Sequence, residues 1–276
     1  MSLFTIDPKL CKRDGICAEE CPARIIEIGK NGDFPSPVEK AEEICIHCGH
    51  CVAVCPHGAL SLKTMRPGDC FPIRKETLPR FESTVEFLKS RRSIRAYKEN
   101  PVKRGTLLTL IDVARYAPSG SNSQPVHWLL IEDKKEVKRL GALVIDWMRL
   151  MVKENSEVAV AGRFDRIVQA WDEGMDIDRI FRGAPHVIVA FGLKTLPRAQ
   201  PACIIALTYL ELAAYAMGLG ACWAGYFMGA SQSFSPLIRD LDLPEDHQVF
   251  GAMMIGYPKH HYYRIPMRDE PKIMWR

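Results

Sequence analysis

Cys45-Ile-His-Cys48-Gly-His-Cys51-Val-Ala-Val-Cys55-Pro56 is the stretch that decides the fold of the first part of this chain. It spaces four cysteines as C-x2-C-x2-C-x3-C and places a proline after the last one. A second copy of the pattern lies 34 residues upstream, with Asp14 standing where the first has Cys48. The other places of the upstream copy are filled by Cys11, Gly15, Cys17, Cys21 and Pro22. Seven cysteines and one carboxylate therefore fill eight equivalent positions.

These spacings predict two iron–sulfur clusters. Thiolates are the soft ligands that such clusters prefer, and three closely spaced thiolates can each hold one corner of a cluster. In a two-cluster arrangement the fourth cysteine of each run ligates the other cluster. We therefore expect a [4Fe-4S] cluster on Cys45, Cys48, Cys51 and Cys21. The other cluster would be held by Cys11, Asp14, Cys17 and Cys55.

Asp14 makes the two sites different. An oxygen ligand holds iron more weakly in a sulfur-rich site, so the Asp14 site is expected to hold either a [4Fe-4S] cluster with a labile iron or a [3Fe-4S] cluster. The alternative is that Asp14 is a solvated turn residue before Gly15, although the register of the repeat favours the ligand position. Zinc is disfavoured because four-ligand zinc sites usually come as two separated pairs. Disulfides are disfavoured because nothing resembles a signal peptide.

Residues 1–65 resemble the bacterial two-cluster ferredoxin domain. The resemblance covers both cysteine runs and the apolar residues that follow each of them, Ile25, Ile26 and Ile28 in one half and Ala59, Leu60 and Leu62 in the other. It implies a small ferredoxin-like domain whose two halves repeat one another.

The composition is that of a soluble, cytoplasmic protein of about two domains. The chain has 276 residues, is 47% hydrophobic, and contains ten cysteines, which fits a reducing compartment. Its net charge of +4 is spread without basic runs, which argues against nucleic acid and favours small anionic molecules as partners. Leu212–Ala230 is uncharged and long enough to span a membrane, but it contains four glycines. We expect a buried helix that runs into a loop, and no membrane contact.

A linker is expected at 66–80 and a second domain at 81–276. The linker contains Pro67, Gly68, Pro72 and Pro79. Ser83 and Glu86 predict a capping box at the start of an amphipathic helix. Further helices are expected at about 103–116, within 134–180 and at 202–217, and strands at 127–132, 186–192 and 249–256. Because strands and helices do not alternate regularly, the fold class is α+β.

Arg91-Arg92-Ser93-Ile94-Arg95 places three guanidinium groups and a hydroxyl within five residues. Arginine forks match phosphate oxygens two at a time, and Arg91 and Arg95 would share one face if this segment were helical. The alternative is that these cations are dipole partners at a helix C-terminus.

Three further segments, taken with the arginines, resemble the nitroreductase family. They are Ala117–Pro125 with its P-S-x-x-N-x-Q-P pattern, Gly218–Gly225 with G-L-G-x-C-W-x-G, and Gly256-Tyr257-Pro258 with Arg264 after it. All occur in the family's order over residues 81–276. The resemblance implies an FMN-dependent homodimer of α+β fold, with a flavin in each of two clefts at the subunit interface.

The same resemblance implies which residues hold FMN. The phosphate would meet Arg91, Arg92, Ser93 and Arg95, and Arg264 would close the site. The isoalloxazine would meet Pro118, Ser119 and Asn122 of the partner subunit, with Gln124 beside them. The backbone of Trp223, Ala224 and Gly225 would lie near the N5 edge. A polar turn after a helix is the simpler alternative for Ser119 and Asn122.

Residues 134–180 carry large apolar side chains without a sharp motif. Methionines and aromatics at helical spacing favour plain core packing over a lid above the substrate cleft. These residues are Trp147, Met148, Met151, Phe164 and Trp171. Cys70, Cys203 and Cys222 lack ligand spacing and are expected to be buried or incidental thiols.

Joining the two halves predicts an FMN oxidoreductase that receives electrons through its own clusters and reduces a small acceptor, such as a nitro or quinone-like compound. Clusters move one electron at a time, whereas a flavin handles one or two. The external donor would be reduced ferredoxin or NAD(P)H, and reverse flow stays open. One alternative is an NAD(P)H-dependent nitroreductase with a non-participating ferredoxin domain. Another is a redox carrier or sensor without turnover.

Overall fold

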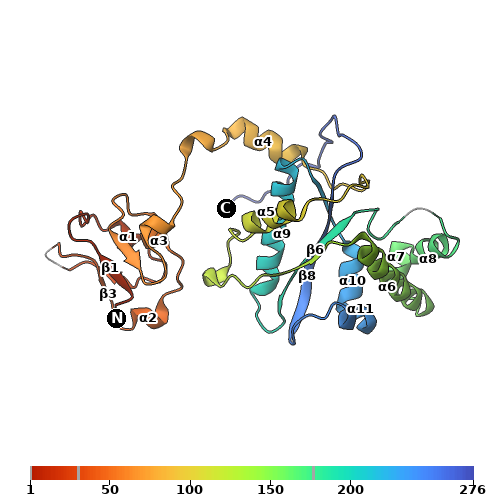
Figure 1. The fold of residues 1–276 in the computed structure, drawn as a ribbon, viewed down its shortest axis with the longest axis horizontal. Coiled ribbons are helices and arrows are strands. Elements are labelled where there is room, and N and C mark those ends of the chain that lie inside the picture. The colour runs from red at the N-terminus through yellow and green to blue at the C-terminus, as the bar shows by residue number, and fades with distance from the viewer. Residues whose placement is uncertain (1, 30–31, 176–177) are drawn as a thin grey trace. The chain divides into compact units, whose positions relative to one another are not determined.

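The computed structural model describes residues 2–29, 32–175 and 178–276. Contacts divide the chain into two compact units, which Figure 1 shows as ribbons. The first unit comprises residues 1–79 with 121–123, and the second comprises residues 80–120 with 124–276.

The first unit is built from two short antiparallel strand pairs and three one-turn helices. β1 (Phe4–Ile6) pairs with β4 (Leu60–Leu62), and β2 (Ile26–Glu27) pairs with β3 (Ser36–Pro37). The helices are α1 (Ile16–Glu19), α2 (Ala41–Ile44) and α3 (His50–Ala53). Two further single turns, η1 (Pro67–Asp69) and η2 (Lys75–Thr77), follow this core. The core packs apolar strand residues around buried cysteines, so the hydrophobic centre of the unit and its thiols coincide.

The repeat seen in the sequence is also a repeat of backbone conformation. Adding 34 to the first and last residue numbers of α1 gives the first and last residue numbers of α3. Gly15 and Gly49, the residues before these helices, have φ of +80° and +75°. Only glycine adopts this left-handed conformation without strain, so the glycine in each copy is what allows the sharp turn after the second ligand position.

The second unit is organised around a four-stranded antiparallel sheet. Its strands lie in the order β5 (His127–Ile131), β6 (His186–Leu193), β8 (His247–Gly256) and β7 (Gly220–Trp223). Helices separate the strands along the chain without a parallel crossover. The predicted α+β class is therefore confirmed.

Helices cover both faces of this sheet. β6 alternates its side chains, so that Val187 and Val189 join one core cluster while Ile188 and Ala190 join the other. α5 (Arg104–Ala114) and α9 (Ala199–Ala216) pack on one face, and α6 (Lys134–Lys153), α8 (Phe164–Asp172) and α10 (Gly225–Ser233) pack on the other, as Figure 1 shows within this unit. The remaining helices are α4 (Phe81–Ser90), α7 (Glu157–Gly162), α11 (Ser235–Asp240) and the single turn η3 (Gly120–Asn122).

The start of α4 differs from the sequence expectation. The helix begins at Phe81 with Arg80 as its N-cap, and the backbone N–H of Thr84 donates to the Arg80 carbonyl over 2.9 Å. Ser83 therefore lies inside the first turn and does not cap it. The predicted capping box is wrong because the first hydrogen bond of the helix is accepted by Arg80, three residues before Ser83 and directly after Pro79.

The segment Leu212–Ala230 is not one helix. α9 ends at Ala216, β7 follows, and α10 begins at Gly225. Within the described residues, α9 is the one helix long and apolar enough to cross a membrane, with a mean hydropathy of 1.2. Core helices pass the same test, and α9 packs Cys203, Leu207 and Leu210 against α5 and the sheet.

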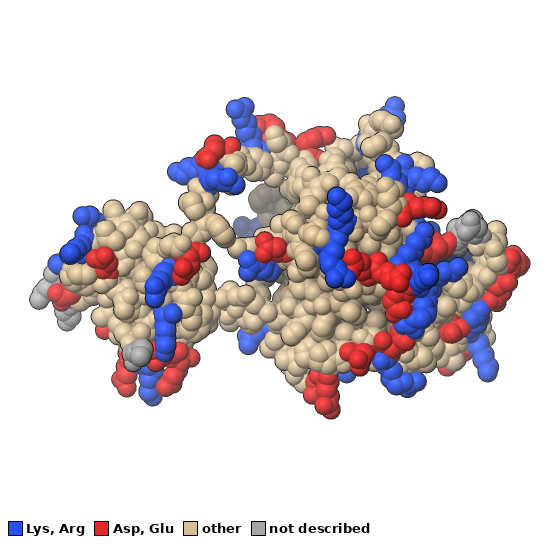
Figure 2. All heavy atoms as spheres, in the orientation of Figure 1, with Lys and Arg blue, Asp and Glu red and all other residues tan. Residues whose placement is uncertain are grey.

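The large apolar residues of 134–180 lie in the core. Trp147, Met148 and Phe164 are at most 5% exposed, and Met151 and Trp171 pack against the same cluster. Ion pairs tie the polar side of α6 to its neighbours, because Arg139 binds Asp240 of α11 and Arg149 binds Asp172 of α8. Lysine and arginine are interspersed with aspartate and glutamate on the visible face of the chain in Figure 2.

Candidate cofactor sites

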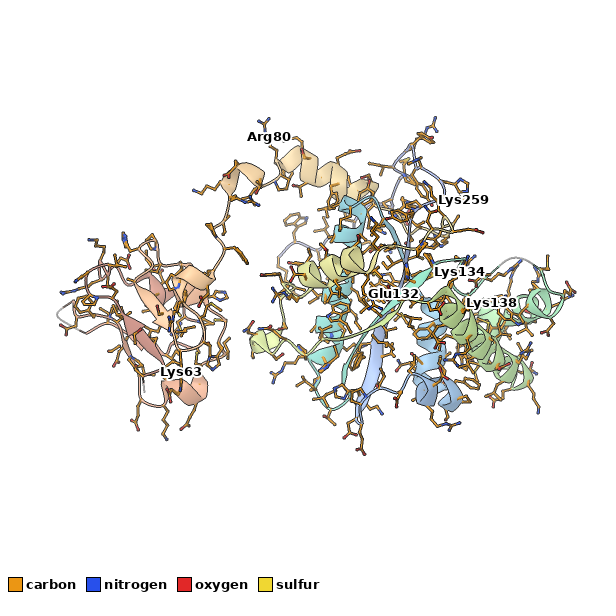
Figure 3. All side chains as sticks on the ribbon, viewed as in Figure 1. Lys63, Arg80, Glu132, Lys134, Lys138 and Lys259 are labelled. Atoms are coloured by element: carbon orange, nitrogen blue, oxygen red, sulfur yellow. The ribbon has the colours of Figure 1, made fainter. Side chains whose placement is uncertain are left out.

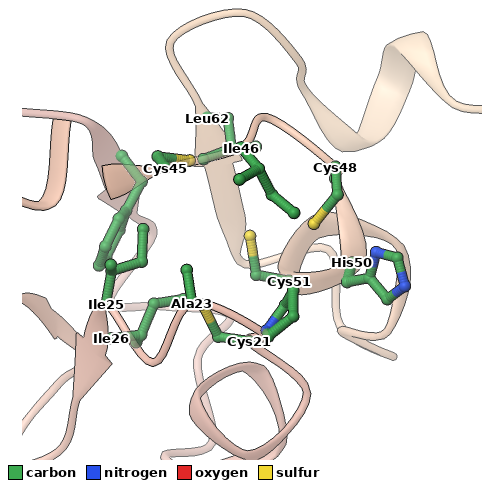
Figure 4. A pocket seen from close by; sticks show the side chains of 13 residues that line it. Cys21, Ala23, Ile25, Ile26, Cys45, Ile46, Cys48, His50, Cys51 and Leu62 are labelled. Carbon is green, nitrogen blue, oxygen red and sulfur yellow. The ribbon is translucent and has the colours of Figure 1, made fainter. Parts of the chain in front are cut away.

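Four cysteines surround one pocket in the first unit, with about 370 Å³ of empty space including open solvent. Figure 4 shows the sulfur atoms of Cys48 and Cys51 pointing into this space. Cys45 comes from the same run, whereas Cys21 comes from the other copy of the repeat. The remaining lining is mostly apolar, as expected for a site that binds through sulfur. The residues around this pocket therefore fit an iron–sulfur cluster.

A second pocket, of about 320 Å³, is lined by the other ligand positions. Cys11, Asp14 and Cys17 reach it from the first run, and Cys55 reaches it from the second. The carboxylate of Asp14 lies at the pocket wall and also accepts weakly from the backbone N–H of Ile16, over 3.4 Å. Asp14 therefore occupies the position of the missing cysteine and also takes part in the local turn.

Each pocket is lined by residues from both copies of the pattern, as expected if the fourth cysteine of each run ligates the other cluster. Three positions of each pocket come from one run and the fourth comes from the other. Among the described residues, no three His, Cys, Asp or Glu side chains gather closely enough to hold a single metal ion, so the sulfurs stand around cavities rather than at one point.

Local hydrogen bonds and burial affect the thiols. The backbone N–H of Ala59 donates to Sγ of Cys55 over 3.3 Å, a contact of the kind that shifts cluster potentials. Burial raises the pKa of Cys51 to about 11 and also raises the pKa of Cys17. Without a cluster these thiols keep their protons at neutral pH, and cluster assembly must release them.

The arginine segment, Arg91–Arg95, leaves α4 in an extended conformation, with Arg91 at φ −56° and ψ 132°. Arg91 and Arg95 would share one face only if the segment were helical, and this condition is not met because the helix ends at Ser90. The N–H of Ile94 donates to the carbonyl of Ala221 over 2.9 Å, which places the segment along the edge strand β7. Gly220 permits this approach, since a Cβ there would meet Ile94 Cγ1 at 2.5 Å.

Arg91 is held by a buried carboxylate. Its guanidinium donates to Glu211 of α9 over 2.8 Å, and Glu211 is 8% exposed. Burial raises the pKa of Glu211, while the charge of Arg91 and its hydrogen bond act in the opposite direction. Close by in the chain, Ser90 and Tyr215 hydroxyls lie 2.7 Å apart, which attaches the end of α4 to the same helix.

Two other arginines act electrostatically on the Cys222 thiol of β7. Burial raises the pKa of Cys222, whereas the charges of Arg95 and Arg182 and a hydrogen bond with Ser93 lower it. Nε of Arg92 is buried and has no hydrogen-bond partner among the described residues. A cluster of guanidinium groups with an unsatisfied buried donor fits a phosphate group.

Arg182 and Glu211 were not predicted from the sequence. Arg182 has φ of +60° in a turn where the Asp178 carboxylate accepts from the backbone N–H groups of Ile180, Phe181 and Gly183. No motif marks this arginine, because its neighbours in space are distant in sequence. The uncharged stretch that follows Glu211 was the sequence feature that indicated a buried helix in this region.

The residues expected near the flavin ring lie in two places. After β7, Ala224 N–H donates to the Ala252 carbonyl over 2.9 Å, and a Cβ on Gly225 would meet nothing within 4 Å, so the backbone is accessible at the start of α10. In the other place, Ser119 Oγ accepts from the backbone N–H of Gln124 over 2.9 Å, just after Pro118. Asn122 belongs to the 121–123 segment, which groups with the first unit.

The C-terminal segment passes beside the arginine segment. Lys259 N–H donates to the Ala96 carbonyl over 3.0 Å, and Lys98 N–H donates to the Tyr257 carbonyl over 2.8 Å. The guanidinium of Arg92 lies 5.9 Å from the ring centre of Tyr262. Arg264, two residues further on, is exposed in the same segment.

Comparison with known proteins identifies both units. Residues 88–257 match the nitroreductase family, and residues 9–60 match the 4Fe-4S dicluster domain. An NADH dehydrogenase of Thermus thermophilus is 26% identical over 213 residues, covering 72% of this chain and 98% of the relative. An iodotyrosine deiodinase of Thermotoga neapolitana is 24% identical over 184 residues, covering 67% of this chain and 93% of the relative.

A solved structure shares the fold of the second unit. It is a nitroreductase with bound FMN from Bacteroides fragilis, 19% identical, with a TM-score of 0.56 and coverage of 70% of this chain and 98% of that one. The family match spans most of the chain, and the two cysteine-lined pockets lie within the dicluster match. This chain therefore belongs to the nitroreductase family of oxidoreductases and carries a 4Fe-4S dicluster ferredoxin domain at its N-terminal side.

Proposed function

We propose that this protein is an FMN-dependent oxidoreductase that takes in electrons through its own iron–sulfur clusters and reduces a small acceptor, such as a nitro or quinone-like compound. The observation that carries the proposal is that one chain contains both kinds of site. Two pockets are each lined by cysteines from both copies of the repeat, and the nitroreductase domain carries a group of arginines beside β7. Clusters supply single electrons, and a flavin exchanges one or two.

In this proposal the two pockets hold different clusters. Cys21, Cys45, Cys48 and Cys51 hold a [4Fe-4S] cluster. Cys11, Asp14, Cys17 and Cys55 hold either a [4Fe-4S] cluster with Asp14 as the fourth ligand or a [3Fe-4S] cluster that leaves Asp14 free. The domain limits we propose are 1–65 for the cluster domain, 66–80 for the linker and 81–276 for the flavin domain.

The chain's residues bind and orient FMN in the proposed site. Arg92, Ser93 and Arg95 bind its phosphate, with Arg264 from the C-terminal segment and Arg182 from the loop before β6. Arg91 joins them while anchored by Glu211. The backbone at Trp223, Ala224 and Gly225 contacts the polar edge of the ring, and the partner subunit supplies Pro118, Ser119 and Asn122, with Gln124 beside them. No side chain need act as a nucleophile.

A homodimer completes this site. The stripe of α9 that faces away from the sheet exposes Ile204, Ile205 and Tyr209, and α5 beside it exposes Leu108. Four large apolar side chains on two adjacent helices favour a buried interface. A second copy of this chain covering these helices would bring the loop at 117–125 to the other subunit's flavin.

The second candidate is an NAD(P)H-dependent nitroreductase in which the clusters take no part. The observation that favours it is the similarity to an enzyme named NADH dehydrogenase, together with 26% identity over 187 residues to an FMN reductase [NAD(P)H] of Bacillus subtilis. Both candidates share the flavin site. They differ in whether electrons pass through the clusters.

An anoxic titration followed by visible absorbance and EPR separates them. The cofactor-loaded protein is treated in turn with reduced ferredoxin, NADPH and a nitroaromatic acceptor. If reduced ferredoxin bleaches clusters and flavin, and the acceptor restores both, electrons pass through the clusters. If NADPH reduces the flavin and the clusters stay unchanged during turnover, the second candidate is correct. The EPR spectrum of the oxidised protein shows whether a [3Fe-4S] cluster is present.

A further inference from the structure

The two cluster pockets have rims of different charge. We define the basic rim as the four positions around the Asp14 pocket that carry basic side chains. The repeat supplies an internal comparison, because a shift of 34 residues takes each position to its equivalent at the other pocket. The basic rim consists of Lys9, Lys12, Arg13 and His57, and the equivalents are Glu43, Ile46, His47 and Ala23.

The basic rim lies at the surface. Lys12 and His57 line the pocket itself, and all four rim side chains are exposed. Arg13 is held in place, since its guanidinium stands 4.2 Å from the ring centre of Phe34 and donates to the Gly32 carbonyl over 3.3 Å. The charge at this opening is therefore presented by an ordered residue as well as by lysines.

Nearby carboxylates offset only part of this charge. Asp14 lines the pocket and is exposed, and its charge is used by the cluster where it serves as the fourth ligand. Asp7 accepts from the backbone N–H of Lys9 over 2.8 Å, so its carboxylate belongs to the turn that presents this lysine. Further exposed carboxylates are Asp33, directly before Phe34, and Glu19 and Glu20 at the end of α1. At the other pocket, no Lys, Arg, Asp or Glu contributes to the lining among the described residues.

We propose that the basic rim is the docking site of an acidic one-electron carrier protein, which delivers electrons at the Asp14 pocket. This rests on the proposed function, and it assigns the point of entry and the kind of partner. One electron leaves the reduced carrier and enters the cluster at this pocket, so the carrier is oxidised by one electron and no bond or proton is exchanged. Opposite charge at such a contact accelerates encounter and fixes orientation.

The chemistry favours a protein over a nicotinamide at this rim. A reduced nicotinamide dinucleotide is also anionic, because of its phosphates. However, it gives up a hydride, which carries two electrons, whereas an iron–sulfur cluster accepts one electron at a time. Lys9 lies in the turn that the Asp7 carbonyl closes, and Lys12 and Arg13 follow it, so one short segment carries three exposed cations. An acidic protein surface matches this exposed positive charge.

The test is the rate at which a reduced acidic bacterial ferredoxin reduces the clusters of the full, cofactor-loaded chain, followed by stopped-flow absorbance. The variant is Lys9→Glu with Lys12→Glu, which spares the packed Arg13. The matched control is Lys40→Glu with Lys63→Glu, which makes the same change of charge on exposed residues that line neither pocket. Figure 3 labels Lys63. Dithionite reduction checks that the clusters of each variant are intact.

We expect the rim variant to lower the second-order rate constant about tenfold or more at low salt, within the range of electrostatic steering. The wild-type rate should fall as salt rises, and the variant rate should depend less on salt. The control pair should keep at least half of the wild-type rate, and dithionite should reduce all three proteins alike.

Equal rates for the wild type and the rim variant, or an equal loss in the control pair, would overturn the proposal. So would NADPH reducing the clusters faster than ferredoxin does, with that rate lost in the rim variant. The reduction of the clusters is measured separately from that of the flavin. If electrons reach the clusters but not the flavin, the proposed function is contradicted, and the docking proposal is still tested by the cluster rates.

Discussion

Nη1 of Arg91 lies 2.8 Å from Oε1 of Glu211, joining the C-cap residue of α4 to the C-terminal half of the apolar helix α9. The two residues are 120 positions apart. Their side chains are 26% and 10% exposed, so the pair is shielded from solvent on the carboxylate side. This pair anchors the arginine segment at one end, and the Ile94–Ala221 hydrogen bond holds it further along.

Replacing Glu211 with alanine should destabilise the second unit. The change leaves Arg91 without its partner at a largely buried position, and breaking such pairs costs about 3–5 kcal/mol when both groups are buried. Because Arg91 is partly exposed, we expect a smaller loss, about 1–3 kcal/mol in the free energy of unfolding measured in urea. The exposed Glu245→Ala is the control and should change this quantity by less than about 0.5 kcal/mol. Equal losses in both variants would contradict the anchoring role.

Replacing Asp14 with cysteine should convert the Asp14 pocket to full thiolate ligation. If the wild type holds a [3Fe-4S] cluster or one labile iron there, Asp14→Cys should raise the bound iron and remove any [3Fe-4S] EPR signal from the oxidised protein. Asp33→Cys, at an exposed turn of the same unit, introduces a thiol outside the pocket and should leave the spectrum unchanged. An unchanged spectrum in Asp14→Cys would show that Asp14 is only a turn residue.

Removing Arg182 should weaken FMN binding. If its guanidinium contacts the phosphate, Arg182→Ala loses a charge-assisted hydrogen bond worth about 1.5–3 kcal/mol, which is roughly a tenfold to hundredfold rise in Kd. Arg95→Ala should act in the same direction, because both cations lie near Cys222. The measurement is FMN fluorescence quenching on the flavin-free protein. Arg166→Ala, exposed on α8, is the control, and a Kd that does not change in Arg182→Ala would remove this residue from the site.

Acid should destabilise the second unit through His186. Val102 N–H donates to Nε2 of this buried ring over 2.8 Å, so Nδ1 carries the proton and donates to the Glu132 carbonyl over 2.8 Å. Burial lowers the pKa of His186 below its usual 6.5, so the folded state favours the neutral ring. The stability this contributes is complete above pH 6.5 and is lost as the pH falls through the lower folded pKa.

Urea unfolding at several pH values between 7.5 and 5, followed by tryptophan fluorescence, checks this dependence. His186→Gln should be less stable at pH 7.5, because it cannot reproduce both hydrogen bonds, and its stability should change less with pH over this window. His247→Gln, at a more exposed ring, should keep the wild-type slope. Parallel slopes in the wild type and His186→Gln would mean that other groups cause the acid loss.

Much of the first unit could be predicted because its information is local. Within each copy, the pattern cysteines, the glycine between them and the proline after them lie within a dozen residues of one another, and the two copies share the same register. The short helices α1 and α3 were not predicted. The strands β5, β6 and β8 were also predicted within about two residues, because each is a continuous apolar run between turn residues. β7 was not predicted because Gly220–Trp223 is short and is flanked by glycines. The strand forms because it pairs with β8, and its own sequence does not specify a strand.

The proposed flavin site shows where prediction from sequence ends. The arginine motif was visible in the sequence, but its conformation was not, because a hydrogen bond with β7 holds the segment extended. The sequence by itself determined the eight positions of the repeated cysteine pattern, the two-part organisation and the family motifs, because covalent spacing and local backbone preferences specify them. Only the tertiary structure decided that Glu211 holds Arg91 and that the charges of Arg182 and Arg95 both act on the Cys222 thiol. Those contacts join segments separated by tens of residues or more, and burial of the intervening apolar elements, which no local pattern encodes, brings them together.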